Sequence, residues 1–190
     1  MISLSSNRRS SITADRGFTL FELMVTASIA AILAAVALPA FHAFVLNDRD
    51  IAQINSLVAS FNYARSEAVK QNLSTGIVVC PSSDRSTCNG SSAWSGGWIV
   101  WNTNSSAPQG QMVLQAVPAL AGGNTLTATG AGAAGITFQS NGMVNGPLTI
   151  VVCDPRGAAQ ALDVEVNATG RVAASQTPGK SVSGLTLTCS

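Results

Sequence analysis

The stretch Gly17-Phe18-Thr19-Leu20-Phe21-Glu22-Leu23 opens the apolar run that decides how this chain is built. No formally charged residue lies between Glu22 and Asp48, and residues 23–46 are almost wholly Ala, Val, Leu, Ile, Phe and Met. A helix over residues 18–38 would be roughly 31 Å long at about 1.5 Å per residue, close to the hydrocarbon thickness of a bilayer. The sequence therefore predicts a membrane-spanning helix here.

Charge is scarce and unevenly placed. Charged residues make up 10% of the 190 residues, hydrophobic residues make up 46%, and the net charge is +1. Residues 1–17 hold Arg8, Arg9 and Arg16 against Asp15. The positive-inside rule then keeps residues 1–17 cytoplasmic and places the chain after the span on the periplasmic or outer side. A neutral polar surface of this kind suits a secreted or packed-together protein and does not suggest a cytosolic enzyme.

Glu22 does not fit a simple membrane anchor. A carboxylate near the start of a membrane helix costs a few kcal/mol and by default indicates function. In one interpretation the side chain only reaches to the lipid headgroups. In the other it needs a buried cation, and a free α-amino group created by cutting just before Phe18 would supply one.

The order of these features resembles the processing site of class III signal peptides in type IV pilins and type II secretion pseudopilins. A basic leader, Gly17, Phe18, Glu22, an apolar run and Pro39 follow one another as in that family. The resemblance implies that a prepilin peptidase cuts between Gly17 and Phe18 and N-methylates Phe18. It also implies that Glu22 neutralises the N-terminal ammonium of a neighbouring subunit and so sets the register of assembly.

An ordinary cleavable signal peptide is the competing interpretation of the same segment. Ala35-Val36-Ala37 and Ala40-Phe41-His42-Ala43 both resemble A-x-A cleavage sites. That interpretation needs an unusually long apolar region and leaves Glu22 unexplained.

The helix is expected to continue past the membrane to about Gln71-Asn72, with a kink at Pro39. Beyond Asp48 the apolar residues recur in steps of three and four, which traces one helical face: Ile51, Ile54, Leu57, Val58, Phe61, Ala64 and Ala68. A half-buried helix of this kind needs the rest of the chain to lie against.

From Thr75 onward short apolar runs alternate with turn residues, which predicts antiparallel sheet. The expected strands are Ile77–Cys80, Trp98–Trp101, Met112–Val117, Asn124–Ala128, Ile136–Gln139, Leu148–Cys153, Ala161–Asn167, Arg171–Ala174 and Leu185–Cys189. The predicted fold class is α+β, a long N-terminal helix with a membrane-spanning first half, packed on C-terminal antiparallel β-sheets.

The segments around Ala64–Val69, Ile77–Ser82 and Gly97–Val100 narrow the resemblance to the GspH/FimT family of minor pilins and pseudopilins. It implies a pilin-like fold and three segments: a cleaved leader over 1–17, a transmembrane and filament-core helix over 18–46, and a periplasmic globular domain over 47–190. In that domain the helix runs to about residue 72 and β-sheets follow.

The function that this resemblance implies is structural, a minor type IV pilin assembled into a type IV pilus or priming it. Two alternatives stay open: a type II secretion pseudopilin of the GspH kind, and a pilus-associated DNA receptor. The implied partners are other pilin-like subunits through the N-terminal helix, the prepilin peptidase and the inner membrane. The chain would start as a single-pass inner-membrane protein and then move to the pilus.

Four cysteines, Cys80, Cys88, Cys153 and Cys189, allow three pairings into two disulfides if the protein is exported. We prefer Cys80–Cys88 with Cys153–Cys189, because the first pair closes a short local loop and the second pins the C-terminus.

The sequence shows no catalytic constellation, so we expect neither an enzyme nor a cofactor or metal. His42 is the single histidine and lies just beyond the apolar run. Asp163 and Glu165 share one face of a predicted strand, which we interpret as a solvated face. Arg65 and Glu67 are either solvated charges or partners of the sheet or of a neighbouring subunit.

DNA binding has little support in the charges. In FimT-type members that bind DNA the resemblance implies a Gly-Arg-x-Arg motif, whereas here Gly170-Arg171 is followed by Val172-Ala173. Lys180 is the one positive charge after it, so Arg171 and Lys180 are the candidate DNA contacts. Two cations give weak, salt-sensitive binding.

Overall fold

The computed structural model describes residues 17–72, 76–104 and 112–189. Its one helix is α1, Leu20–Gln71. Eight strands follow: β1 Ile77–Pro81, β2 Trp98–Asn102, β3 Val113–Val117, β4 Thr125–Thr129, β5 Ile136–Phe138, β6 Leu148–Cys153, β7 Leu162–Val166 and β8 Val172–Ala174. The chain divides into two compact units, residues 1–44 and 45–190, and α1 contributes residues to both.

In the first unit, the described chain is almost entirely helical, and its side chains are exposed. Thr19 precedes the first turn, and nearly every side chain from Gly17 to Phe44 is exposed. α1 passes Pro39 without a break, so the kink predicted there does not interrupt the helix. Hydroxyls such as that of Ser28, which donates to the Met24 carbonyl oxygen at 2.8 Å, are satisfied inside the helix.

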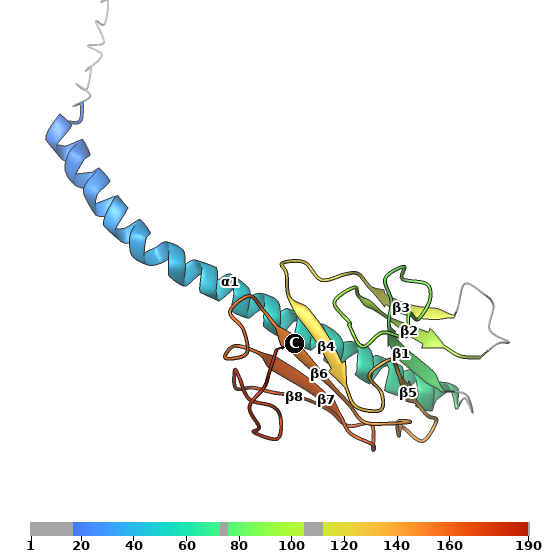
Figure 1. The fold of residues 1–190 in the computed structure, drawn as a ribbon. Helices are drawn as coiled ribbons and strands as arrows, with labels where there is room; N and C mark the ends of the chain where they lie inside the picture. The colour runs from blue at the N-terminus through green and yellow to red at the C-terminus, as the bar shows by residue number, and fades with distance from the viewer. Residues whose placement is uncertain (1–16, 73–75, 105–111, 190) are drawn as a thin grey trace, which may run out of the picture. The chain divides into compact units, whose positions relative to one another are not determined.

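The second unit packs the last part of α1 against two four-stranded antiparallel sheets (Figure 1). The strand orders are β3-β2-β1-β5 and β4-β6-β7-β8. The predicted apolar face of the helix supplies its share of the core, with Leu57, Phe61, Ala64 and Ala68 fully buried. Phe61 lies 6.0 Å from the Trp94 ring and 6.4 Å from the Phe138 ring, centroid to centroid.

The helix ends where the sequence predicted, because Asn72 adopts a left-handed backbone with φ of 48°. Asparagine tolerates that conformation better than most residues, and it terminates helices. The predicted α+β architecture, a long N-terminal helix with antiparallel sheets after it, is confirmed.

The last predicted strand, Leu185–Cys189, is wrong. The segment instead forms a tight turn in which the Leu185 carbonyl oxygen accepts from the Ser181 N–H at 2.8 Å, with one isolated bridge between Lys180 and Thr186. Leu187 packs on Cys153 and Ala161, so packing and the disulfide to Cys189 hold this segment instead of a strand ladder. We call residues 179–187 the C-terminal hairpin.

Both disulfides are formed in the preferred pairing. The Cα atoms are 5.5 Å apart in Cys80–Cys88 and 6.0 Å apart in Cys153–Cys189. The first closes the loop after β1, and the second ties the end of the chain to the end of β6.

Candidate functional site

The start of α1 is built as an N-terminal cap. The Thr19 hydroxyl oxygen accepts the backbone N–H of Glu22 at 3.1 Å, and the Thr19 carbonyl oxygen accepts the N–H of Leu23 at 3.1 Å. Thr at the cap and Glu three residues later is the capping-box spacing. The Glu22 side chain is exposed, and its carboxylate accepts no hydrogen bond from the residues that the structure describes. The cap therefore fixes the backbone at Glu22 and leaves the carboxylate free for another partner.

The bond before Phe18 lies outside the helix. Residues 17–19 have no regular secondary structure, and α1 begins only at Leu20. A Cβ built on Gly17 would meet no atom within 4 Å. Both Gly17 and Phe18 are exposed among the described residues.

The apolar run presents a continuous exposed hydrophobic surface. Phe18, Leu20 and Phe21 are each more than three-quarters exposed, and Ile32, Val36 and Leu38 are about two-thirds exposed or more. Among the described residues, α1 is the one helix long and apolar enough to cross a membrane, and only 6% of its most apolar window is buried. A surface of this kind needs lipid or other helices to cover it.

In the second unit, a buried polar cluster joins α1 to the loop before β4 and to the loop after β6. Asp50 accepts from the Asn124 amide at 2.6 Å and from the Arg156 guanidinium at 3.2 Å. Arg156 also donates to Asn47 at 2.7 Å and forms an ion pair with Asp154. Burial raises the pKa of Asp50, while the Asn124 hydrogen bond acts against that rise.

Sequence reasoning missed this cluster. In the sequence, Asp154-Pro155-Arg156-Gly157 has only the composition of a turn, and the bond from Arg156 to Asp50 spans 106 positions. Local spacing carries no signal for a pair so far apart.

The structure decides between the two interpretations of Arg65. Its guanidinium donates to the Gly142 carbonyl oxygen at 3.2 Å and to that of Thr169 at 3.5 Å, so it joins α1 to two loops of its own chain. Glu67 instead accepts from Lys70 and Gln71 on the same helix.

Asp163 is the main departure from expectation. It was predicted to lie on a solvated strand face, but it is fully buried because the C-terminal hairpin covers that face. One carboxylate oxygen accepts the Val182 N–H at 3.1 Å, while the other has no partner among the described residues. Burial, first of all, raises the pKa of Asp163 to about 6, and the charge of Glu165 adds to the rise.

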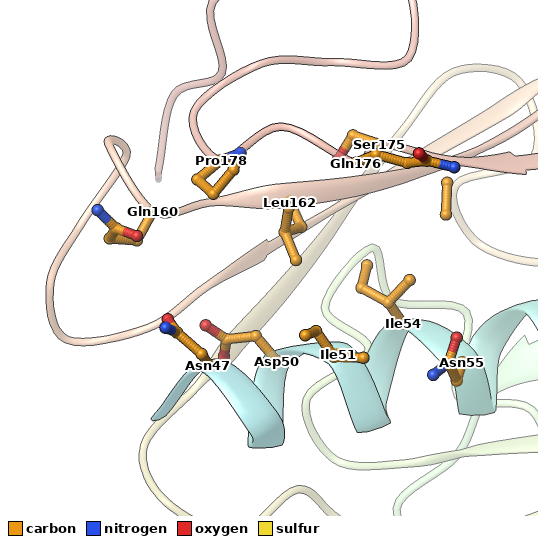
Figure 2. Close-up of a pocket in the computed structure, with 11 residues that line it drawn as sticks. Asn47, Asp50, Ile51, Ile54, Asn55, Gln160, Leu162, Ser175, Gln176 and Pro178 are labelled. Carbon is orange, nitrogen blue, oxygen red and sulfur yellow. The ribbon is translucent and has the colours of Figure 1, made fainter. Parts of the chain in front are cut away.

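A groove of about 510 Å³ runs between α1 and the end of the second sheet (Figure 2). Its floor is apolar, with Leu162 on β7 pointing toward Ile51 and Ile54 on the helix. Its rim carries side-chain amides: Asn47, Asn55, Gln160 and Gln176.

The two candidate DNA contacts lie at one hollow. Arg171 and Lys180 are exposed, and both line a depression of about 630 Å³ beside β8. Gly170 before them has no room for a side chain, since an added Cβ would lie within 2.0 Å of the Gly142 carbonyl oxygen.

Metal-binding clusters are absent from the part of the chain that the structure covers. No three His, Cys, Asp or Glu side chains there are grouped so that they could hold a metal ion. The side chain of His42 is exposed and belongs to no cluster.

Comparisons with known proteins agree with this arrangement. The family model described as type II transport protein GspH matches residues 53–170, and the prokaryotic N-terminal methylation motif matches residues 12–38. A comparison with curated proteins found no match.

Two solved structures of type IV minor pilin FimU from Pseudomonas aeruginosa are similar to the chain. The crystal form in space group P21 is 23% identical with a TM-score of 0.51, covering 70% of this chain and 98% of that one. The form in space group P65 is 22% identical with a TM-score of 0.49, covering 65% of this chain and 90% of that one. The likeness to the P21 form, at this identity, shows a shared fold.

Proposed function

Since the chain belongs to the GspH family, with a minor pilin or pseudopilin role, we propose that it is a minor subunit of a type IV pilus. In this role it would be assembled into the filament or into the complex that primes it. The observation that carries the proposal is the N-terminal segment, where an exposed Gly17–Phe18 bond precedes a capped helix with a free carboxylate and an exposed apolar surface.

Processing would be the first step. A prepilin peptidase removes residues 1–17 by cutting between Gly17 and Phe18, and Phe18 is then N-methylated. The match of the methylation motif to residues 12–38 supports this step, and so does the position of the bond ahead of the first helical turn.

Assembly would then bury the exposed helix over residues 18–46 among the helices of other pilin-like subunits. In such an apolar bundle an unpaired carboxylate is costly, so Glu22 selects the register in which it meets a positive N-terminus. The cap at Thr19 supports this role, because it holds the Glu22 backbone while the side chain stays free.

The proposed topology is a single pass through the inner membrane with residues 1–17 cytoplasmic. Residues 47–190 would be periplasmic before assembly and would lie at the pilus surface afterwards. The two disulfides support an oxidising compartment for this domain, because disulfides persist mainly in exported proteins.

The experiment that tests the proposal uses the full-length chain with Glu22→Ala, produced in a strain that lacks the native gene. We expect the mature N-terminus to remain N-methylated Phe18 by mass spectrometry, while the amount of subunit in sheared pili falls at least fivefold. Glu67→Ala is the matched control, since that carboxylate bonds only within its own helix. Normal incorporation of the Glu22 variant would contradict the proposed register role.

A type II secretion pseudopilin is the second candidate, favoured by the description of the matching family model. The FimU structures, described as a type IV minor pilin, favour the pilus. Co-purification of the chain from membranes separates the two, since the accompanying subunits belong either to pili or to the secretion system.

DNA reception is the third candidate, and it is supported by the placement of Arg171 and Lys180 at one hollow. Two cations supply few phosphate contacts. We therefore expect binding to duplex DNA only at low salt.

A further inference from the structure

The free edge of the second sheet is β8, and its backbone is unpaired on the outer side (Figure 1). In its pairing with β7, Arg171 accepts from the Asn167 N–H at 3.1 Å and Ser175 donates to the Asp163 carbonyl oxygen at 2.9 Å. Hydrogen-bonded pairs alternate along an antiparallel ladder. The N–H and C=O groups of Val172 and Ala174 therefore point away from β7, and they have no partner within the described part of the chain.

The end strands β4 and β5 differ from β8, because each carries added backbone hydrogen bonds on its outer side. Along β4 the segment Ser92–Trp94 adds backbone bonds, with the Trp94 N–H donating to the Leu126 carbonyl oxygen at 2.8 Å. Along β5 the Asn145 N–H donates to the Thr137 carbonyl oxygen at 3.1 Å.

Hollows lie on both faces of the β8 edge. On the side of α1, Ala174 lines the 510 Å³ groove whose floor is Ile51, Ile54 and Leu162 (Figure 2). On the opposite side the 630 Å³ depression runs along Arg171–Thr177, and Lys180 and Val182 of the C-terminal hairpin also line it. A strand added to β8 would project alternate side chains into these two spaces.

The groove toward α1 and the depression on the opposite side of β8 differ in chemistry, and this difference indicates which kind of peptide segment would bind there. The groove toward α1 is apolar in its floor. The opposite depression carries the cations Arg171 and Lys180 and no acid in its lining. Two carboxylates lie next to the lining: the buried Asp163, which accepts the Val182 N–H, and the half-buried Glu165, which pairs with Ala173. An extended segment in which apolar and acidic residues alternate fits both.

We propose that the β8 edge binds an extended segment of a partner protein, with its apolar residues in the groove against α1 and its acidic residues facing Arg171 and Lys180. Edge strands commonly recruit peptides in this way, with backbone hydrogen bonds giving affinity and side-chain pockets giving specificity. Within the described chain, Leu162–Val166 of β7 has this alternation, but β6 and β8 already pair with it. The described residues of a second folded copy therefore do not supply the segment from β7.

The test uses the purified full-length chain in non-ionic detergent and a fluorescein-labelled peptide, Glu-Val-Glu-Val-Glu-Val-Glu-Val. We expect saturable binding by fluorescence anisotropy. The corresponding Lys-Val peptide and a copy N-methylated on the amides of one edge should each bind at least tenfold more weakly. Slowed amide exchange at Val172 and Ala174 should accompany binding.

Three variants locate the site. Ala174→Pro removes an outward N–H that the fold does not use, Ile51→Asp puts a charge into the groove without touching the sheet, and Arg171→Glu with Lys180→Glu reverses the opposite face. Each should weaken binding of the Glu-Val peptide at least tenfold, while Arg85→Glu, an exposed control outside both hollows, should change it less than twofold.

The proposal is overturned by any of three results: no saturable binding, equal binding of the N-methylated or lysine peptide, or binding that Ile51→Asp leaves unchanged in a folded protein. Binding of duplex DNA that depends on Arg171, with no binding of the Glu-Val peptide, would instead assign the depression to nucleic acid. The inference adds a partner surface to the proposed pilus function, but it is measured without filaments. Failure of peptide binding therefore leaves the Glu22 result standing, and the reverse also holds.

Discussion

Among single residues, Asp163 has the environment least expected from the sequence. Strand alternation correctly puts Leu162, Val164 and Val166 toward the core and Asp163 on the other face. It cannot say that the C-terminal hairpin covers that other face, because the hairpin lies almost twenty positions farther along the chain. The result is a buried carboxylate with one oxygen unpartnered, an arrangement that costs free energy when the group is charged.

The pH dependence of stability follows from Asp163. Its pKa of about 6 in the folded chain is above the ordinary value of 3.8, so the folded state takes up a proton that the unfolded state does not bind. Stability from this group is full below about pH 4 and is lost as the pH rises through 6. We expect Asp163→Asn to raise the free energy of unfolding by about 1 to 3 kcal/mol at pH 7.5 and to flatten its slope between pH 5 and 7.5.

Thermal unfolding followed by circular dichroism at several pH values measures this slope. Asp48→Asn is the control, since that carboxylate is exposed and does not contribute to the pKa of Asp163. An unfolding temperature of the parent chain that rises from pH 5 to 7.5 would contradict the prediction. Hydrogen bonds in its loop hold the pKa of Asp84 well below the usual range. Its contribution to stability therefore changes only at a pH below the range of this experiment.

Arg156 is the second residue whose role depends on long-range structure. It keeps a quarter of its side-chain surface exposed while it neutralises Asp50 and Asp154. Arg156→Met should cost about 2 to 4 kcal/mol, since it leaves two carboxylates without their cation, and partial exposure keeps the loss below that of a fully buried pair. Chemical denaturation measures the loss, and the exposed Arg171→Met should change stability by less than about 0.5 kcal/mol.

At the level of elements, the helix and the first eight strands were predictable, and the reason is local. α1 from Ile54 to Ala68 shows its core face in the spacing of apolar residues, and β1 and β6 are β-branched runs between turns. Leu185–Cys189 looked like a strand by the same rule, but a turn at Ser181–Leu185 and the bond to Cys153 take its place. The motif at Gly17–Glu22 could be interpreted from sequence because it is contiguous, whereas the Asp50 cluster and the β8 edge depend on pairings that only the fold provides.

The packing of α1 on the sheets gives a prediction for the element as a whole. Phe61 is fully buried between Trp94 and Phe138. Phe61→Ala should therefore cost about 3 to 5 kcal/mol through lost contacts and a cavity. Val69→Ala, at a half-exposed position on the same helix, should cost less than about 1 kcal/mol in the same denaturation experiment. Similar losses at both positions would show that α1 is not a core element.

For the whole molecule, the orientation in the membrane decides whether the disulfides can form. Residues 1–17 carry three arginines, and we expect them to hold that end in the cytoplasm, so that Cys80, Cys88, Cys153 and Cys189 reach an oxidising compartment. Replacing Arg8, Arg9 and Arg16 with Glu should leave the globular domain in the cytoplasm with all four thiols reduced. Alkylation with a maleimide polymer in lysed, acid-quenched cells then counts four reactive thiols, against none in the parent chain.

The control keeps the charge and changes the residue type, with the same three positions replaced by Lys. Its four cysteines should remain unreactive, because the rule depends on positive charge and both side chains carry it. Four oxidised cysteines in the Glu variant would mean that another feature of the chain sets its orientation. Free thiols in the parent chain would remove the support that the disulfides give to a periplasmic domain. They would also count against assembly of that domain into a filament outside the cytoplasm.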